Sequence, residues 1–195
     1  MIRLFDIIFS ALGLVLLAPV FVALCLLIRI ESKGGCFYIQ ERIGKGGKPF
    51  GLYKFRTMRT GSDAEGLLTV GEHDTRITRI GYFLRKTKID ELPQLLNVLK
   101  GDMSLVGPRP EVRKYVELYT EEQRRVLNVR PGITDYASIE YVNENELLSQ
   151  TDDPDRTYIE EIMPDKIKLN MKYLENYTLK EYFKIIFLTF KSLVS

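Results

Sequence analysis

The first thirty residues are the most hydrophobic part of the chain. The 22 residues from Ile7 to Ile28 include no Asp, Glu, Lys or Arg. At about 1.5 Å per residue, a helix of this length would just cover the roughly 30 Å hydrocarbon core of a bilayer. A cleavable signal peptide fits less well, because the apolar run continues beyond Ala18-Pro19 and no cleavage site of small residues precedes a polar start. The pattern therefore predicts a membrane anchor.

A proline lies in the middle of this apolar run. Pro19 removes one backbone hydrogen bond and crowds the preceding turn, so a kink is expected there. Each half would be too short to cross a bilayer alone, whereas the whole run is long enough. Arg3 lies before the run and Arg29 and Lys33 at its other end, so charge does not orient it. The residues leave a re-entrant anchor and a straight span equally open.

Two aromatic-rich segments follow the anchor. They occupy residues 36–40 and 50–56 and flank a glycine-rich turn at 44–49, which together predict a β-hairpin. The turn lacks the spacing of a phosphate-binding loop, so it is interpreted as a plain turn. The polar stretch 60–74 predicts a surface loop.

Apolar residues at helical spacing then predict two short helices within residues 77–99, on either side of a join at 86–91. Asp90 can cap the second helix, and Pro93 suits its first turn, where a missing N–H costs little. Gly101 is expected to end this helix.

The carboxylates in the join are the candidates for chemistry. Asp90 and Glu91 stand together at a predicted helix start, with Arg85 close upstream to bind phosphate. A cap and a first-turn acid would account for the pair without any function. The following segment, Gly101–Pro110, is rich in glycine and proline and carries Arg109, as expected of a loop that shapes a site.

Charge and cysteine content exclude other classes. The 28 Lys and Arg residues against 26 Asp and Glu give a net charge of +2, which is too small for a broad nucleic-acid-binding surface. A chain of 195 residues allows one domain, or one domain plus an anchor, and hardly two complete cores. Cys25 and Cys36 lack CxxC spacing and histidine neighbours, which predicts free thiols.

The C-terminal segment, residues 179–195, predicts an amphipathic helix at the membrane interface. A helix packed on the domain core is the alternative. Its apolar stripe consists of Leu179, Tyr182, Phe183, Ile186, Phe187, Phe190, Leu193 and Val194.

A long motif ends at Pro110. It includes Leu84-Arg-Lys-Thr-Lys-Ile-Asp-Glu-Leu-Pro-Gln-Leu-Leu-Asn-Val-Leu-Lys-Gly-Asp-Met-Ser-Leu-Val-Gly-Pro-Arg-Pro110. This run closely resembles the bacterial sugar transferase family, the monotopic phosphoglycosyl transferases. Further matches, in order along the chain, are Arg3-Leu-Phe-Asp6, Lys54-Phe-Arg-Thr-Met58 and Arg130-Pro-Gly-Ile-Thr134. The resemblance spans nearly the whole chain and is to the small, minimal form of the family.

The resemblance implies a membrane-associated α/β fold with mostly helical content, a domain organisation and a location. Residues 1–30 would form a re-entrant membrane helix broken near Pro19, residues 31–178 a cytoplasmic catalytic domain, and residues 179–195 an amphipathic interfacial helix. The protein would be monotopic in the bacterial inner membrane, with its catalytic domain facing the cytoplasm. The lipid bilayer is thus an expected partner, nucleic acid is not, and a homodimer is left open.

The resemblance also implies a reaction. A sugar 1-phosphate would pass from a UDP-sugar to polyprenyl (undecaprenyl) phosphate through a phosphosugar on Asp90, with release of UMP. Glu91 would assist at the metal or at the lipid phosphate, and Mg²⁺ would be held partly by Asp90 and the diphosphate. The residues expected to bind phosphate or the nucleotide sugar are Lys54, Arg85, Pro108, Arg109, Pro110 and Arg130.

Two departures from the family pattern affect these expectations. Ala18-Pro19 replaces the usual Ser-Pro at the membrane bend, so the bend would rest on the proline. Asp135 and Tyr136 replace residues that are usually small or apolar, which predicts that they tune the sugar specificity. Two other functions stay open: a membrane-anchored UDP-sugar hydrolase, and a noncatalytic nucleotide-binding adaptor of a polysaccharide assembly complex.

Overall fold

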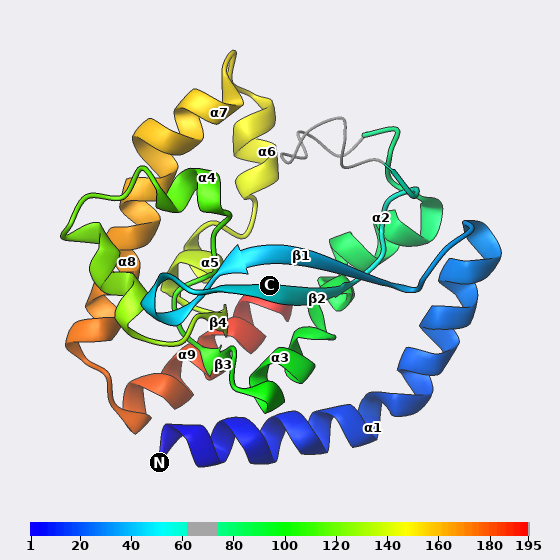
Figure 1. Cartoon of the computed structure of the whole chain (residues 1–195), viewed down its shortest axis with the longest axis horizontal. Helices are drawn as coiled ribbons and strands as arrows, with labels where there is room; N and C mark the ends of the chain where they lie inside the picture. The colour runs from blue at the N-terminus through cyan, green and yellow to red at the C-terminus, as the bar shows by residue number, and fades with distance from the viewer. Residues whose placement is uncertain (62–73, 195) are drawn as a thin grey trace.

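The computed structural model describes residues 1–61 and 74–194, which form a mostly helical protein with two small sheets. Figure 1 shows α1 (Ile2–Glu31) along one edge of the molecule and the hairpin of β1 (Phe37–Ile43) and β2 (Pro49–Phe55) crossing its middle. Most of the predicted loop 60–74 lies outside the described residues. The other elements are η1 (Lys45–Gly47), α2 (Arg79–Lys86), η3 (Ile89–Glu91), α3 (Gln94–Lys100), β3 (Ser104–Val106), α4 (Arg113–Val116), η4 (Gln123–Asn128), β4 (Gly132–Thr134), α5 (Tyr136–Glu140), α6 (Glu144–Ser149), α7 (Pro154–Thr157), η5 (Tyr158–Ile162), α8 (Met163–Glu175) and α9 (Leu179–Val194).

The N-terminal helix α1 is continuous through Ala18 and Pro19, and Figure 1 shows it bending near its middle. A proline inside a helix kinks it, because the ring removes a hydrogen bond and crowds the preceding turn. A bend thus takes the place of the expected break. The helix is long and apolar enough to cross a membrane, and only 11% of its most apolar window is buried. Whether it spans or re-enters stays a prediction.

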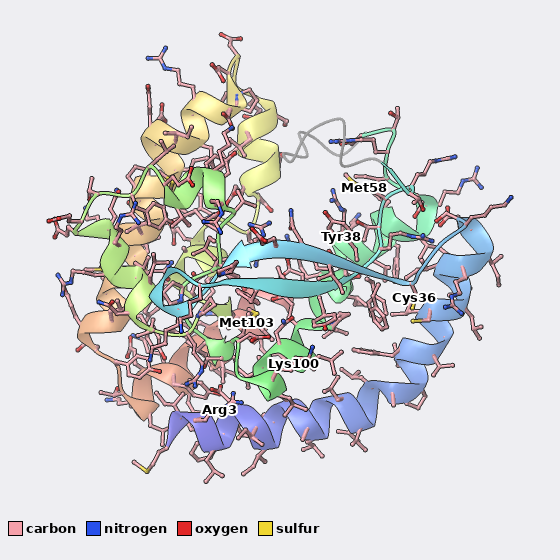
Figure 2. The ribbon with its side chains drawn as sticks, viewed as in Figure 1. Arg3, Cys36, Tyr38, Met58, Lys100 and Met103 are labelled. Atoms are coloured by element: carbon pink, nitrogen blue, oxygen red, sulfur yellow. The ribbon has the colours of Figure 1, made fainter. Side chains whose placement is uncertain are left out.

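Two polar side chains near the start of α1 attach this helix to the domain. Arg3 donates hydrogen bonds to the carbonyl oxygens of Val98 (2.6 Å) and Leu99 (3.0 Å) in the last turn of α3. Figure 2 shows Arg3 pointing toward the end of α3 that carries Lys100. Because a helix C-terminus leaves carbonyl groups unpaired and carries a partial negative charge, the guanidinium both caps and stabilises it.

The Asp6 carboxylate makes the second attachment and is only 1% exposed. A buried carboxylate needs hydrogen-bond donors, and Asp6 has three, two from β3 and one from α9. Its Oδ1 accepts from the Ser104 hydroxyl (2.9 Å), the Leu105 backbone N–H (3.0 Å) and the Tyr182 hydroxyl (2.9 Å). The Arg-x-x-Asp pattern therefore fastens α1 to α3, β3 and α9.

The predicted hairpin is confirmed. β1 and β2 pair antiparallel from Phe37 opposite Phe55 to Ile43 opposite Pro49, with a plain turn between them. At the start of the hairpin, the sulfur atoms of Cys25 and Cys36 lie 2.6 Å apart, although both cysteines are free. Figure 2 shows Cys36 beside the far end of α1, so this end of the helix also contacts the domain.

The two helices predicted within residues 77–99 are also confirmed, as α2 and α3. Gly101 ends α3 in the left-handed conformation, as expected. The capping role predicted for Asp90 is wrong. Asp90 lies inside the 3-10 turn η3, and α3 begins only at Gln94, with Pro93 at its N-cap. Since Pro93 cannot donate to an earlier turn, the chain enters α3 through a separate tight turn that carries both carboxylates.

Strands β3 and β4 form a short parallel pair that places residues 130–134 against the loop carrying Arg109. The backbone segment that follows β3 and the start of β4 lie very close to each other at Gly107 and Gly132. A Cβ atom built on Gly132 would lie 2.1 Å from the backbone nitrogen of Gly107, a distance that no real side chain tolerates. Glycine at this crossing is therefore a steric requirement.

The C-terminal helix α9 has two kinds of apolar contact. Tyr182 and Ile185 are fully buried in the core with Val106 and Tyr173, so one face packs on the domain, as the alternative interpretation held. Phe187 and Phe190 lie outside that face and are 69% and 67% exposed. Placement at a membrane interface stays a prediction, but α9 carries aromatic rings on its open side.

Candidate active site

A cavity of about 1030 Å³ lies beside the hairpin and the turn η3. Its lining joins residues far apart in the sequence, because β2, η3 and the loop after β3 meet there. Tyr38 and Met58 belong to its wall, and Figure 2 shows both on the side of the hairpin away from α1. One part of the wall is strongly charged and contains Lys54, Arg85, Asp90, Glu91 and Arg109.

Asp90 presents a free carboxylate to this cavity. The residue is 7% exposed, and its carboxylate accepts no hydrogen bond from any residue of the described ranges 1–61 and 74–194. Burial raises the pKa of Asp90, and the neighbouring Glu91 raises it further, whereas the Lys54 ammonium lowers it. An unpaired carboxylate at a cavity wall can act as a nucleophile or as a metal ligand.

Glu91 is held by two cations. Its Oε1 accepts from Lys54 Nζ at 3.0 Å and also from Arg109, and its Oε2 accepts from Arg109 Nη1 at 3.1 Å. This two-pronged contact with a guanidinium is the strongest form of such a pair. Although burial alone would raise the pKa of Glu91, Arg109 and Lys54 hold it well below its usual range. Glu91 therefore stays ionised and is a poor proton acceptor.

The loop carrying Arg109 is fixed by Asp135. The Arg109 backbone N–H donates to Asp135 Oδ2 at 3.0 Å, while Asp135 Oδ1 accepts from the Ser138 N–H at 2.6 Å and caps α5. Asp135 is fully buried and does not line the cavity. Its predicted role in sugar specificity stays a prediction, and an effect could pass through Arg109 or through Ser138, which both line the cavity.

The two prolines of the same loop serve as backbone acceptors. The Pro108 carbonyl accepts from the Gly132 N–H at 3.0 Å, and the Pro110 carbonyl accepts from Arg42 Nη1 at 3.2 Å. Of the Pro-Arg-Pro sequence, only the side chain of Arg109 reaches this cavity. The prolines therefore shape the loop, and their predicted part in binding the nucleotide sugar stays a prediction.

The other predicted binding residues separate into two groups. Arg85 lines the cavity and donates from Nε to the Thr57 hydroxyl at 3.0 Å, with Asp90 among its nearby charges. Arg130 does not line the cavity and donates instead to the Gly101 carbonyl at 2.8 Å. Tyr136 does not line it either, and its hydroxyl donates to Glu181 of α9.

Of the two adjacent carboxylates on this wall, Asp90 is the one that could hold an Mg²⁺ ion. Residues 1–61 and 74–194 contain no group of three or more His, Cys, Asp or Glu side chains placed to hold a metal. Mg²⁺ usually takes one or two carboxylates together with substrate phosphates and waters, so a single protein ligand is sufficient. Asp90 meets this need because its carboxylate is free, whereas both oxygens of Glu91 are bound to Lys54 and Arg109.

The sequence did not predict a second set of polar residues on the cavity wall. It comprises Arg42, Glu111, Glu144, Tyr158 and Lys166. A signal was present, since Lys166 interrupts the apolar face of a helix and Glu111 directly follows the Pro-Arg-Pro sequence. These residues lie up to 124 positions apart, from 42 to 166, and sequence spacing does not reveal such proximity.

The chain is similar to known proteins over its whole length. The model of a family described as bacterial sugar transferase matches residues 1–195. The UDP-N-acetylgalactosamine-undecaprenyl-phosphate N-acetylgalactosaminephosphotransferase of Aeromonas hydrophila is 37% identical over 195 residues, which cover 97% of this chain and 43% of that protein. The UDP-glucose:undecaprenyl-phosphate glucose-1-phosphate transferase of Caulobacter vibrioides is 36% identical over 196 residues, covering 99% and 69%. The chain thus spans less than half the length of the Aeromonas relative.

Proposed function

Because the chain belongs to the bacterial sugar transferase family, we propose that it transfers a sugar 1-phosphate from a UDP-sugar to undecaprenyl or another polyprenyl phosphate. The names of the Aeromonas and Caulobacter relatives describe this type of reaction with two different sugars. The observation that carries the proposal is the free Asp90 carboxylate on a cavity wall, beside three cationic side chains. The step would begin polysaccharide or glycoconjugate assembly.

In the first step, an Asp90 oxygen attacks the sugar-side phosphorus of the UDP-sugar. The bond from that phosphorus to the bridging oxygen breaks, and UMP leaves with the electron pair. The product is a phosphosugar joined to Asp90 as an acyl phosphate. In the second step, an oxygen of the polyprenyl phosphate attacks the same phosphorus, and Asp90 leaves as a carboxylate. The product is a polyprenyl diphosphate sugar.

The cationic side chains would bind the phosphates. Arg85, Lys54 and Arg109 line the same cavity as the two carboxylates, and their charges would offset those of the diphosphate. Glu91 would act mainly as a positioning residue, since it holds Lys54 and Arg109 and stays ionised. Mg²⁺, with Asp90 as its protein ligand, would supply charge neutralisation at the phosphate oxygens.

The acceptor lipid lies in a membrane, and two apolar surfaces of the protein could contact that membrane. The open apolar surface of α1 and the exposed Phe187 and Phe190 of α9 can both contact lipid. Residues 1–30 and 179–195 would thus flank a catalytic domain at 31–178 on the cytoplasmic face of the inner membrane. UDP-sugars are made in the cytoplasm, which supports a cavity that opens on that side.

The proposed function is tested by a donor panel. Purified protein in nanodiscs is incubated with individual UDP-sugars, Mg²⁺ and undecaprenyl phosphate, and both UMP and lipid-linked sugar are measured. At least one UDP-sugar should give equal amounts of the two products, and chelating Mg²⁺ should stop both. Sugar phosphate released without lipid product would indicate the hydrolase, and nucleotide binding without UMP would indicate the adaptor.

The topology of α1 is tested by cysteine labelling. In a protein with Cys25 and Cys36 replaced by Ser, Leu4→Cys and Lys33→Cys place one thiol near each end of the helix. A re-entrant helix bent at Pro19 should leave both thiols unreactive to an impermeant maleimide in intact spheroplasts and reactive in inverted vesicles. Reaction of the Leu4→Cys thiol in spheroplasts would instead indicate a straight span.

The proline is tested in the same system. Pro19→Leu restores the missing hydrogen bond and removes the cause of the bend, so the segment should straighten and expose the Leu4→Cys thiol to the periplasm. Ala18→Leu is the matched control, because it adds a similar side chain beside Pro19 and keeps the proline. If both variants label alike, Pro19 does not determine the topology.

A further inference from the structure

A second polar cluster forms another part of the cavity wall, away from Asp90. Its members are Arg42 of β1, Glu111 after the Pro-Arg-Pro sequence, Glu144 of α6, Tyr158 of η5 and Lys166 of α8. Figure 1 shows why these segments can meet, because α6, α7 and α8 stand together beside one end of the hairpin. The reaction proposed above assigns none of these five residues a role.

The members of the cluster contact one another. Lys166 Nζ lies 2.7 Å from Glu144 Oε2 and 4.0 Å from Glu111 Oε1. Glu111 also accepts a hydrogen bond from the Tyr158 hydroxyl and lies 3.5 Å from Arg42. The cluster is thus one network with Glu111 at its centre.

Such a network is costly for folding alone. The side chains of Lys166 and Glu111 are 9% and 12% exposed, and removing charges from water offsets much of the attraction between them. Tyr158 also begins a π-helical turn, η5, between α7 and α8. Single π-helical turns are rare and occur frequently at functional sites, which supports a binding role for the residues they aim.

Charge decides which part of a donor this cluster can bind. Arg42 and Lys166 balance Glu111 and Glu144, so this wall has no net positive charge to attract phosphate, whereas Lys54, Arg85 and Arg109 outnumber Asp90 and Glu91 at the other wall. A neutral group rich in hydroxyls suits the cluster, because each hydroxyl can donate to a carboxylate and accept from Lys166 or Arg42.

The cluster is joined to the phosphate-binding loop. Arg42 donates to the Pro110 carbonyl, next to Arg109, and Glu111 is the following residue. A hexose attached to a phosphate bound at Arg109 therefore has the cluster as a neighbour. We propose that Arg42, Glu111, Glu144, Tyr158 and Lys166 form the subsite for the sugar ring of the nucleotide sugar and select among sugars by their hydroxyl and acetamido groups.

This inference rests on the proposed function, but binding measurements test it without turnover. In an Asp90→Asn background, calorimetry measures the affinities of UMP and of UDP-glucose, UDP-galactose, UDP-N-acetylglucosamine and UDP-N-acetylgalactosamine. Glu144→Gln and Lys166→Met should each lower the affinity for the preferred UDP-sugar by about 10- to 100-fold. This is the loss expected for one hydrogen bond to a charged group. The affinity of UMP should stay unchanged.

Matched controls lie on the same helices. Glu146→Gln on α6 and Lys168→Met on α8 make the same chemical changes at exposed positions and should alter no affinity. Tyr158→Phe removes one hydroxyl, keeps the ring, and serves if a charge variant fails to fold. Thermal unfolding of each variant shows whether the fold is kept.

Each outcome decides the assignment. Equal loss of affinity for UMP and all UDP-sugars would indicate that the cluster binds the nucleoside, and would overturn the proposal. Unchanged affinity for every ligand would overturn it as well. An unchanged order of preference among the four sugars would also overturn it. Failure of the proposed function looks different, because UDP-sugars would bind as described here while the unmodified protein made no lipid-linked product.

Discussion

Replacing Asp90 with Asn should reduce lipid-linked product by about 10³-fold or more, because Asn keeps the size of the side chain but cannot form the acyl phosphate. Unmodified protein given UDP-sugar and Mg²⁺ without lipid should release up to about one UMP per molecule and gain the mass of one phosphosugar. Intact-mass spectrometry should detect this adduct in the unmodified protein and not in Asp90→Asn. Adding polyprenyl phosphate should remove it.

The same variant should fold at least as well as the unmodified protein. Burial raises the pKa of Asp90, so its ionised form is less favourable in the folded state than in the unfolded state. This cost is full at pH values above the folded-state pKa and disappears below the unfolded value of about 3.9. Asp90→Asn should therefore unfold at an equal or higher temperature at neutral pH. Asp152→Asn, which makes the same change at an exposed position, is the control. If Asp90→Asn formed as much lipid-linked product as the unmodified protein, Asp90 would not be the nucleophile.

Replacing Glu91 with Gln should have the opposite effect on stability and should also impair activity. The charged Glu91 pairs with Lys54 and Arg109, whose side chains are 19% and 33% exposed. Removing its charge should therefore cost about 1 to 3 kcal/mol of unfolding free energy, less than the loss of one partner of a fully buried pair. Arg109 would lose its main positioning contact, and misplacement of a phosphate-binding group by about 1 Å can cost about 10²-fold in rate. Product formation and the free energy of unfolding should therefore fall together.

The pH dependence identifies the cause of the lost stability. Lys54 and Arg109 hold the pKa of Glu91 below its unfolded value, so its contribution is fully present above about pH 4.3 and is lost as the pH falls through the folded-state pKa. The difference between Glu91→Gln and the unmodified protein should be largest at neutral pH and shrink in acid. Glu117→Gln, at an exposed position, should change neither quantity. A stable, fully active Glu91→Gln protein would contradict the positioning role.

The elements that sequence alone predicted are those with a strong local signal. The run from Ile7 to Ile28 predicted α1, the glycine turn predicted the hairpin, and helical spacing predicted α2, α3 and α9. The start of α3 was placed too early, because a 3-10 turn and an α-helix share much of their residue preference. Here Pro93 separates the two and leaves Asp90 in the turn.

The sequence indicated which charged residues gather at one cavity, but it did not indicate what every candidate side chain contacts. Asp90, Glu91, Arg85, Lys54 and Arg109 do line one cavity, as expected of residues from matching motifs. Arg130 lies in a matching segment too, and Asp135 directly follows it, but their side chains bind backbone groups of other loops. Side-chain direction in a loop depends on contacts distant in sequence, and a motif does not contain that information.

The crossing of Gly107 and Gly132 has a consequence for mutational tolerance. Every other residue type has a Cβ, and at Gly132 that atom would collide with the backbone beside the Pro-Arg-Pro sequence. The loop that presents Arg109 can therefore vary little in its path, even though neither glycine has a side chain to offer a substrate. In a population of variants selected for activity, these two positions would be as restricted as Asp90. This restriction would come from the narrow space between two backbone segments, because neither glycine takes part in the reaction.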